Sequence, residues 1–109
     1  MVIAVLEMVP QLGKREAIVE ILRFVEGHVR LKADCLGCGV FEAADTPKIL
    51  YLEQWRSARD LHAHIKSNLY RPILSAMELA SEAPKISFHD VSETKSMELI
   101  ESLRTEVKA

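Results

Sequence analysis

The first apolar run of the chain predicts a β-strand. Residues 2–9 carry one charge, at Glu7, and end before Pro10, so the run is too short for a helix of ordinary length. Apolar residues fill both sets of alternate positions, which are Val2, Ala4, Leu6 and Met8 on one side and Ile3, Val5 and Val9 on the other. Both faces of this strand therefore need to be covered.

A helical pattern follows the turn at residues 10–13. Its apolar residues recur at intervals of three and four, namely Ile18, Ile21, Leu22, Val25 and Val29. This spacing predicts a helix with one buried face. Gly27 lowers the stability of such a helix by about 1 kcal/mol relative to alanine, so tertiary packing has to hold its last turns.

Residues 38–44 and 49–55 are predicted to form a β-hairpin. Both segments are rich in β-branched and aromatic residues. Asp45 and Pro47 lie between them and favour a turn.

The second helical region is predicted to be broken in two. Residues 57–60 (SARD) have the spacing of a capping box and begin a helix that carries Leu61, Ile65 and Leu69. Pro72 suits the first turn of a second, shorter helix. That helix carries Ile73, Met77 and Ala80 and is expected to end before Pro84.

The end of the chain predicts one more strand and one more helix. Residues 85–91 place Ile86 and Phe88 on one face of a strand. The terminal helix is defined by Met97, Ile100, Leu103, Arg104 and Val107, with Ser92 or Thr94 as its cap.

The order of elements predicts an α+β fold of the ferredoxin-like, or split βαβ, type. It runs strand, helix, strand, strand, helix, strand over residues 1–91, and residues 92–109 form a helical extension. Helices can cover only one face of such a sheet. A second copy that packs sheet against sheet would cover the other, so we expect a homodimer.

Composition narrows the class of protein. The chain has 109 residues, of which 49% are hydrophobic, and a net charge of −2 with both signs mixed along it. One domain of this size can bury a core. There is no basic surface of the kind that binds nucleic acid or an anionic membrane. The amino terminus lacks the basic segment of a signal peptide, so a cytoplasmic protein is expected.

The segment YLEQWRSARDLHAHIKSNLYRPIL resembles the antibiotic biosynthesis monooxygenase family. The family shows a strand with an aromatic end, a capped helix with a histidine two turns in, and a Ser-x-x-aromatic stretch. Here these features are Glu53, Trp55, Ser57, Leu61, His64, Ser67 and Tyr70. The segment CLGCGVFEA is similar to the family's second strand, and the resemblance covers residues 2–91.

The resemblance implies a dimeric α+β barrel with a ligand cleft between each sheet and its helices. Family members include oxygenases of quinols and phenols that need no cofactor, haem-degrading enzymes, isomerases and proteins of unknown activity, so the fold leaves the reaction open. In our alignment with the haem-degrading group, the position of that group's tryptophan is occupied by His64, and the position of its haem-ligating histidine is occupied by Leu74. This sequence therefore lacks both of the group's characteristic residues. We therefore expect no cofactor.

His64 is the predicted catalytic residue. On a helix, His62 and His64 point about 200 degrees apart, so at most one can face a cleft. His64 follows the buried Leu61 by one turn, and it could act as general base toward a phenolic or quinol hydroxyl. The alternative is a histidine that only packs at the junction of helix and sheet.

Tyr51, Trp55 and Asn68 are the predicted substrate-binding residues. Tyr51 and Trp55 share one face of a strand with Glu53 and could line a pocket for a flat ring. Asn68 could donate a hydrogen bond to a substrate oxygen. The plainer interpretation of Trp55 is core packing at the end of a strand.

Cys35 and Cys38 form the C-x-x-C pair of the chain. A redox pair of this type sits at the amino terminus of a helix, whereas here a strand follows. A zinc site needs two further ligands, and no second pair with suitable spacing is present. We expect small packed residues at the start of a strand and no metal, although a reversible disulfide stays open.

The resemblance thus implies a monooxygenase that acts on an aromatic or quinol-like small molecule. A ligand-binding dimer without catalytic activity and an isomerase or lyase on the same scaffold are the alternatives.

Overall fold

A four-stranded antiparallel sheet organises the protein, as seen in a computed structural model that describes residues 1–106. The strands are β1 (Val2–Met8), β2 (Cys35–Glu42), β3 (Ile49–Trp55) and β4 (Lys85–Asp90), in the spatial order β2-β3-β1-β4. The helices are α1 (Arg15–Val29), α2 (Ala58–Lys66), α3 (Arg71–Met77) and α4 (Met97–Glu106), with a 3₁₀ turn η1 (Asn68–Tyr70) between α2 and α3. The predicted ferredoxin-like order is confirmed.

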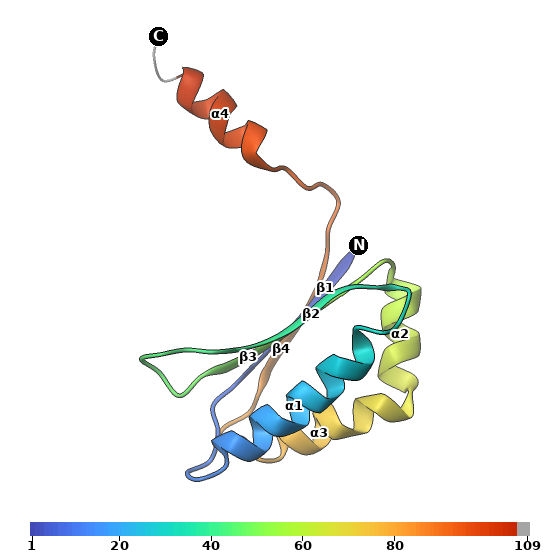
Figure 1. The fold of residues 1–109 in the computed structure, drawn as a ribbon, viewed down its shortest axis with the longest axis vertical. Helices are drawn as coiled ribbons and strands as arrows, with labels where there is room; N and C mark the ends of the chain where they lie inside the picture. Colours follow the sequence, from blue (N-terminus) through green and yellow to red (C-terminus); the bar gives the residue numbers. More distant parts are fainter. Residues whose placement is uncertain (107–109) are drawn as a thin grey trace.

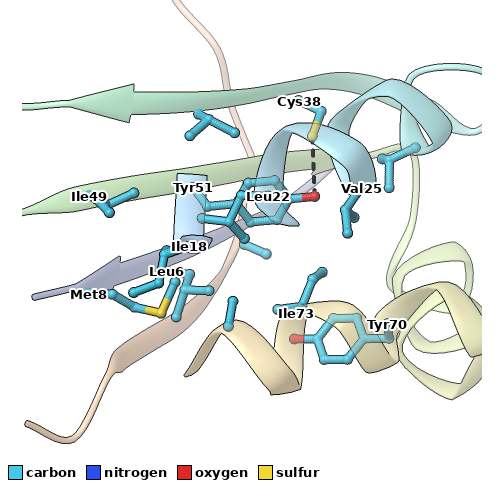
Figure 2. Packing of buried hydrophobic residues seen from close by; sticks show 14 of the residues in the cluster. Leu6, Met8, Ile18, Leu22, Val25, Cys38, Ile49, Tyr51, Tyr70 and Ile73 are labelled. Atoms are coloured by element: carbon cyan, nitrogen blue, oxygen red, sulfur yellow. Dashed lines mark hydrogen bonds between the residues drawn. The ribbon is translucent and has the colours of Figure 1, made fainter. Parts of the chain in front are cut away.

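The core lies between the sheet and the helices α1, α2 and α3, which share one side of it (Figure 1). Alternation along β1 and β3 points every second residue toward the helices. From α1, the predicted apolar stripe enters the same core through Ile18, Leu22, Val25 and Val29. Figure 2 shows side chains of this core from three elements, among them Leu22 of α1, Tyr51 of β3 and Ile73 of α3.

The break between the two middle helices occurs where the sequence predicts it. Ser57 Oγ accepts a hydrogen bond from the backbone N–H of Asp60 and caps α2. The hydroxyl of Ser67 donates to the carbonyl oxygen of His64 at 2.6 Å, where α2 ends. Pro72 lies in the first turn of α3. This break turns the chain and lays α3 against α1.

The main differences from the predicted boundaries lie at the start of β2, the end of α3 and the start of α4. β2 begins at Cys35 rather than Cys38, because a bulge between Cys35 and Gly37 lets the strand continue. α3 ends at Met77, and Ala80 instead pairs with Pro10 in an isolated β-bridge. α4 begins directly after Ser96, so neither predicted cap occupies the capping position. Val107, predicted in the same helix, lies outside the described residues.

α4 projects away from the sheet and its helices (Figure 1). Its large apolar residues Met97, Ile100 and Leu103 are more than half exposed. The division of the chain at residue 91 stays a prediction. None of the described helices combines the length and the apolar character needed to cross a membrane.

Leu22 provides a test of the core. Its side chain is fully buried, so Leu22→Ala removes buried methyl groups and leaves a cavity. We expect the free energy of unfolding in urea to fall by about 3 kcal/mol. Leu12→Ala is the matched control, because Leu12 is fully exposed and its loss should change little. Equal unfolding midpoints for the two variants would contradict the described packing.

Candidate functional site

The carboxylate of Glu53 is the centre of a buried polar cluster. Glu53 lies on the helix-covered face of β3 and is 2% exposed. The hydroxyl of Tyr51 donates to its Oε2 at 2.6 Å, and the indole N–H of Trp55 donates to its Oε1 at 3.0 Å. His64 Nε2 lies 3.0 Å from Oε2. Three side chains from β3 and α2 thus converge on one carboxylate.

Glu53 is held in its ionised form. Burial alone raises the pKa of its carboxyl, but the hydrogen bonds from His64, Tyr51 and Trp55, together with the electrostatic attraction of His64, outweigh burial and keep the pKa below its usual value of 4.5. A carboxylate in this state has only acceptors to offer, so each of the three neighbours must donate a proton to it.

His64 is enclosed by aromatic rings. It faces the core from α2 and is 1% exposed, whereas His62 on the same helix is exposed, as the helical spacing predicts. The imidazole lies against Trp55, with ring centroids 4.8 Å apart. It meets Tyr70 edge-on at 5.4 Å. These contacts fix the plane of the ring.

Lys32 contacts the other nitrogen of this imidazole. Its Nζ lies 3.3 Å from His64 Nδ1 and 5.9 Å from the centroid of the Trp55 ring. An ammonium has only donors, so Nδ1 must be the acceptor in this contact. The ionised Glu53 then requires the proton on Nε2. Both neighbours therefore select one neutral tautomer of His64, with its lone pair on Nδ1.

Cys38 extends the cluster on the side of β2. Its thiol donates to the hydroxyl oxygen of Tyr51 at 3.3 Å (Figure 2). Burial raises the pKa of Cys38 to about 12 and raises that of Tyr51 as well. Both groups are neutral at physiological pH. Tyr51 thus accepts from Cys38 and donates to Glu53.

An apolar groove lies nearby, between α2 and β4. It has a volume of about 270 Å³ and is lined mainly by Val2, Leu61, Ile65 and Phe88, with His62 and Asp90 among its polar residues. Glu53, His64 and Lys32 are not among the residues that line it. The residues that line the groove and those that form the polar cluster are therefore different.

The sequence model of the antibiotic biosynthesis monooxygenase family matches residues 1–74, more than half of the chain. The chain belongs to this family. The match includes β1 to β3, α2 and every residue of the polar cluster. The comparison with curated proteins found no match.

Solved structures share the fold at low sequence identity. A Mycobacterium tuberculosis protein is 21% identical, with a TM-score of 0.79, and the match covers 87% of this chain and 98% of that one. A candidate antibiotic biosynthesis monooxygenase from Deinococcus radiodurans is 19% identical, with a TM-score of 0.78 and coverage of 89% and 98%. Another from Nitrosomonas europaea is 17% identical, with a TM-score of 0.76 and coverage of 85% and 100%.

Within this family member, the structure brings together three of the four predicted site residues. Tyr51, Trp55 and His64 all contact Glu53. Asn68 lies in η1 and is exposed, so its contact with a substrate stays a prediction.

Glu53 was predicted to lie on this face of the strand without a role in the site, and Lys32 was not among the predicted site residues. A glutamate between two aromatic residues on the inner face of a strand was the available signal for Glu53. Lys32 comes from the loop between α1 and β2, and nothing in its sequence context distinguishes it.

The cysteine pair lies in β2 rather than at a helix terminus. The bulge pairs Cys35 with Trp55 and Cys38 with Glu53, which places both on the helix-covered face. Both thiols are free, and burial raises the pKa of each, so neither is an activated nucleophile. Among the described residues, no group of three or more His, Cys, Asp and Glu side chains is placed to hold a metal ion.

The lowered pKa of Glu53 predicts an acid-dependent stability. A folded pKa below the unfolded value of 4.5 stabilises the protein above that pH, and this stabilisation is lost as the pH falls through the folded pKa. The free energy of unfolding of Glu53→Gln should be about 1–3 kcal/mol lower than that of the wild type at neutral pH. It should also decline less steeply as the pH falls. Urea unfolding measured across this pH range tests both points.

The exposed Glu20 supplies the control for this series. Glu20→Gln should follow the wild-type curve. If the free energies of unfolding of wild type and Glu53→Gln fell in parallel with decreasing pH, Glu53 would not be the source of the acid dependence.

Proposed function

We propose that the protein is a monooxygenase that oxidises a phenolic or quinol-like compound with no cofactor of its own. Family membership supports the reaction class. The observation that carries the proposal is the buried imidazole of His64, which contacts Glu53 through Nε2 at 3.0 Å and Lys32 through Nδ1 at 3.3 Å. A base held in one tautomer by a carboxylate is the arrangement that activates a hydroxyl group.

The first step is transfer of the substrate hydroxyl proton to Nδ1 of His64. The resulting imidazolium is stabilised by Glu53, which already accepts from Nε2. The phenolate is electron-rich and supplies the electrons for its own oxidation by O₂. Overall, a phenol and O₂ give a quinone and water, a reaction that balances without an external reductant.

The cluster residues have different parts in this scheme. Trp55 stacks on the imidazole and offers an apolar surface to a flat ring. Tyr51 acts one step away, because its hydroxyl orients Glu53. Asn68 would have to approach the substrate from η1. Since His64 is 1% exposed, a substrate can reach its imidazole only when neighbouring side chains move.

A ligand-binding dimer without catalytic activity is the second candidate. The observation that favours it is the apolar groove beside α2, which is open and does not reach the polar cluster. A ligand that sits there would contact Phe88 and Leu61 and would leave His64 as a structural residue.

Oxygen consumption with a panel of hydroquinones and phenols distinguishes these candidates. Uptake by the wild type should fall by about 100-fold or more in His64→Ala. His62→Ala is the matched control on the same helix and should keep wild-type activity. Uptake that His64→Ala does not change would remove the proposed base. Saturable aromatic binding without any uptake would support the binding module.

We further propose that the protein is a homodimer formed by the uncovered face of the sheet. Ile3, Val5, Leu50, Leu52 and Phe41 lie on this face, and no described helix lies over it (Figure 1). Val5 and Leu52 are register partners near its middle, and Phe41 at its edge is 53% exposed. An apolar face of this extent is typical of an interface.

Leu52→Glu tests the proposed interface, because it places a charge at the centre of the face. The wild type should elute as a dimer and the variant as a monomer in size-exclusion chromatography with light scattering. The exposed Leu12 provides the control, since Leu12→Glu should leave the dimer intact. Circular dichroism confirms that both variants are folded. A monomeric wild type would exclude this interface.

A further inference from the structure

We infer that Lys32 is a positioning residue of the site, which holds His64 Nδ1 before the substrate binds and then pairs with the substrate oxyanion. This inference rests on the proposed function and deepens it. It adds that the site selects compounds whose hydroxyl becomes an anion, and it assigns that selection to one side chain outside the predicted set.

The position of Lys32 supports this role. Its side chain is half-buried, and its Nζ is 3.3 Å from Nδ1, the nitrogen that the proposed reaction uses as base. The backbone of its loop is fixed, since Lys32 donates its N–H to Val29 and accepts from the N–H of Cys35. A short, anchored loop thus brings a cation to the lone pair of the imidazole on Nδ1.

The charges of the cluster balance only when Lys32 is counted. Glu53 is negative on one side of the ring and Lys32 is positive on the other. The remaining ionisable side chains of the cluster, Tyr51, Tyr70 and Cys38, are neutral because burial raises their pKa values. The imidazole therefore lies between two opposite charges, with Glu53 at Nε2 and Lys32 at Nδ1.

Proton transfer to Nδ1 breaks the contact with Lys32. The O–H bond of the substrate breaks, the N–H bond of Nδ1 forms, and the electron pair stays on oxygen. Nδ1 then has no lone pair for the ammonium, and the imidazolium repels it. The nearest anion without a partner is the new oxyanion. Glu53 pairs with the imidazolium, Lys32 pairs with the oxyanion, and the net charge stays zero.

Lys32 could instead serve only to neutralise Glu53 in the folded protein. That role predicts a loss of stability on substitution but no change in which ligands bind. The two roles therefore differ in a measurable way, through the preference of the site for an ionised over a neutral ring.

A matched pair of probes measures this preference. 4-Nitrophenol ionises to a yellow anion, and its methyl ether, 4-nitroanisole, cannot ionise. The wild type should bind the phenol as the anion, seen by absorbance at a pH where the free phenol is mostly protonated. Lys32→Met should weaken binding of the anion by about tenfold or more and leave binding of the ether within about twofold.

Two control variants complete the test. Lys32→Arg keeps the charge and the donors and should retain most of the preference for the anion. Lys66→Met removes an exposed lysine from α2 and should behave as the wild type. Thermal unfolding of each variant establishes that it is folded.

The outcome separates this inference from the proposed oxidation. Loss of the preference in Lys32→Met supports the inference even when no phenol or quinol stimulates oxygen uptake. An absence of oxygen uptake would contradict only the proposed monooxygenase activity. The inference is overturned by an equal preference in wild type and Lys32→Met, or by a wild type that binds the ether as well as the anion.

Discussion

A single buried carboxylate sets the internal geometry of this protein. Moving an ionised glutamate out of water costs several kcal/mol unless hydrogen bonds replace its hydration. Glu53 obtains these bonds from two neighbours on its own strand and from His64 on α2. The described part of the chain leaves no buried side-chain donor or acceptor without a partner. The helix α2 is consequently held against β3 by a requirement for polar partners as well as by apolar packing.

The same contacts give the imidazole properties that packing alone would not require. A histidine that only fills space needs one hydrogen bond. Here both nitrogens are engaged by groups of opposite charge, and the ring is held between Trp55 and Tyr70. Such an arrangement restricts the proton to Nε2 and leaves Nδ1 as the single acceptor. In the proposed function, this acceptor is the atom that takes the substrate proton.

The elements were predictable because each rests on a local pattern. The period of two in β1 and β3, the helical spacing of α1 and the Ser57 cap of α2 are all visible in a short window of sequence. The burial of Tyr51, Trp55 and His64 follows from the same periodicities.

What the sequence did not reveal depends on contacts between distant segments. The bulge after Cys35 is set by pairing with β3, and it moves a cysteine from one face of the sheet to the other. Lys32 meets His64 across 32 positions of sequence, and only the tertiary fold brings them together. A lysine in a loop is not part of a periodic pattern of apolar and polar residues, so its role has to be inferred from the structure.

β3 connects the candidate site to the proposed interface. Tyr51, Glu53 and Trp55 point into the polar cluster, whereas Leu50 and Leu52 point to the opposite, uncovered face. Because successive side chains of a strand alternate, every residue that positions Glu53 has a neighbour on that face. Covering the face with a second copy would exclude water from both sides of β3 and limit its bending. The proposed dimer interface and the three contacts with Glu53 would thus share one strand.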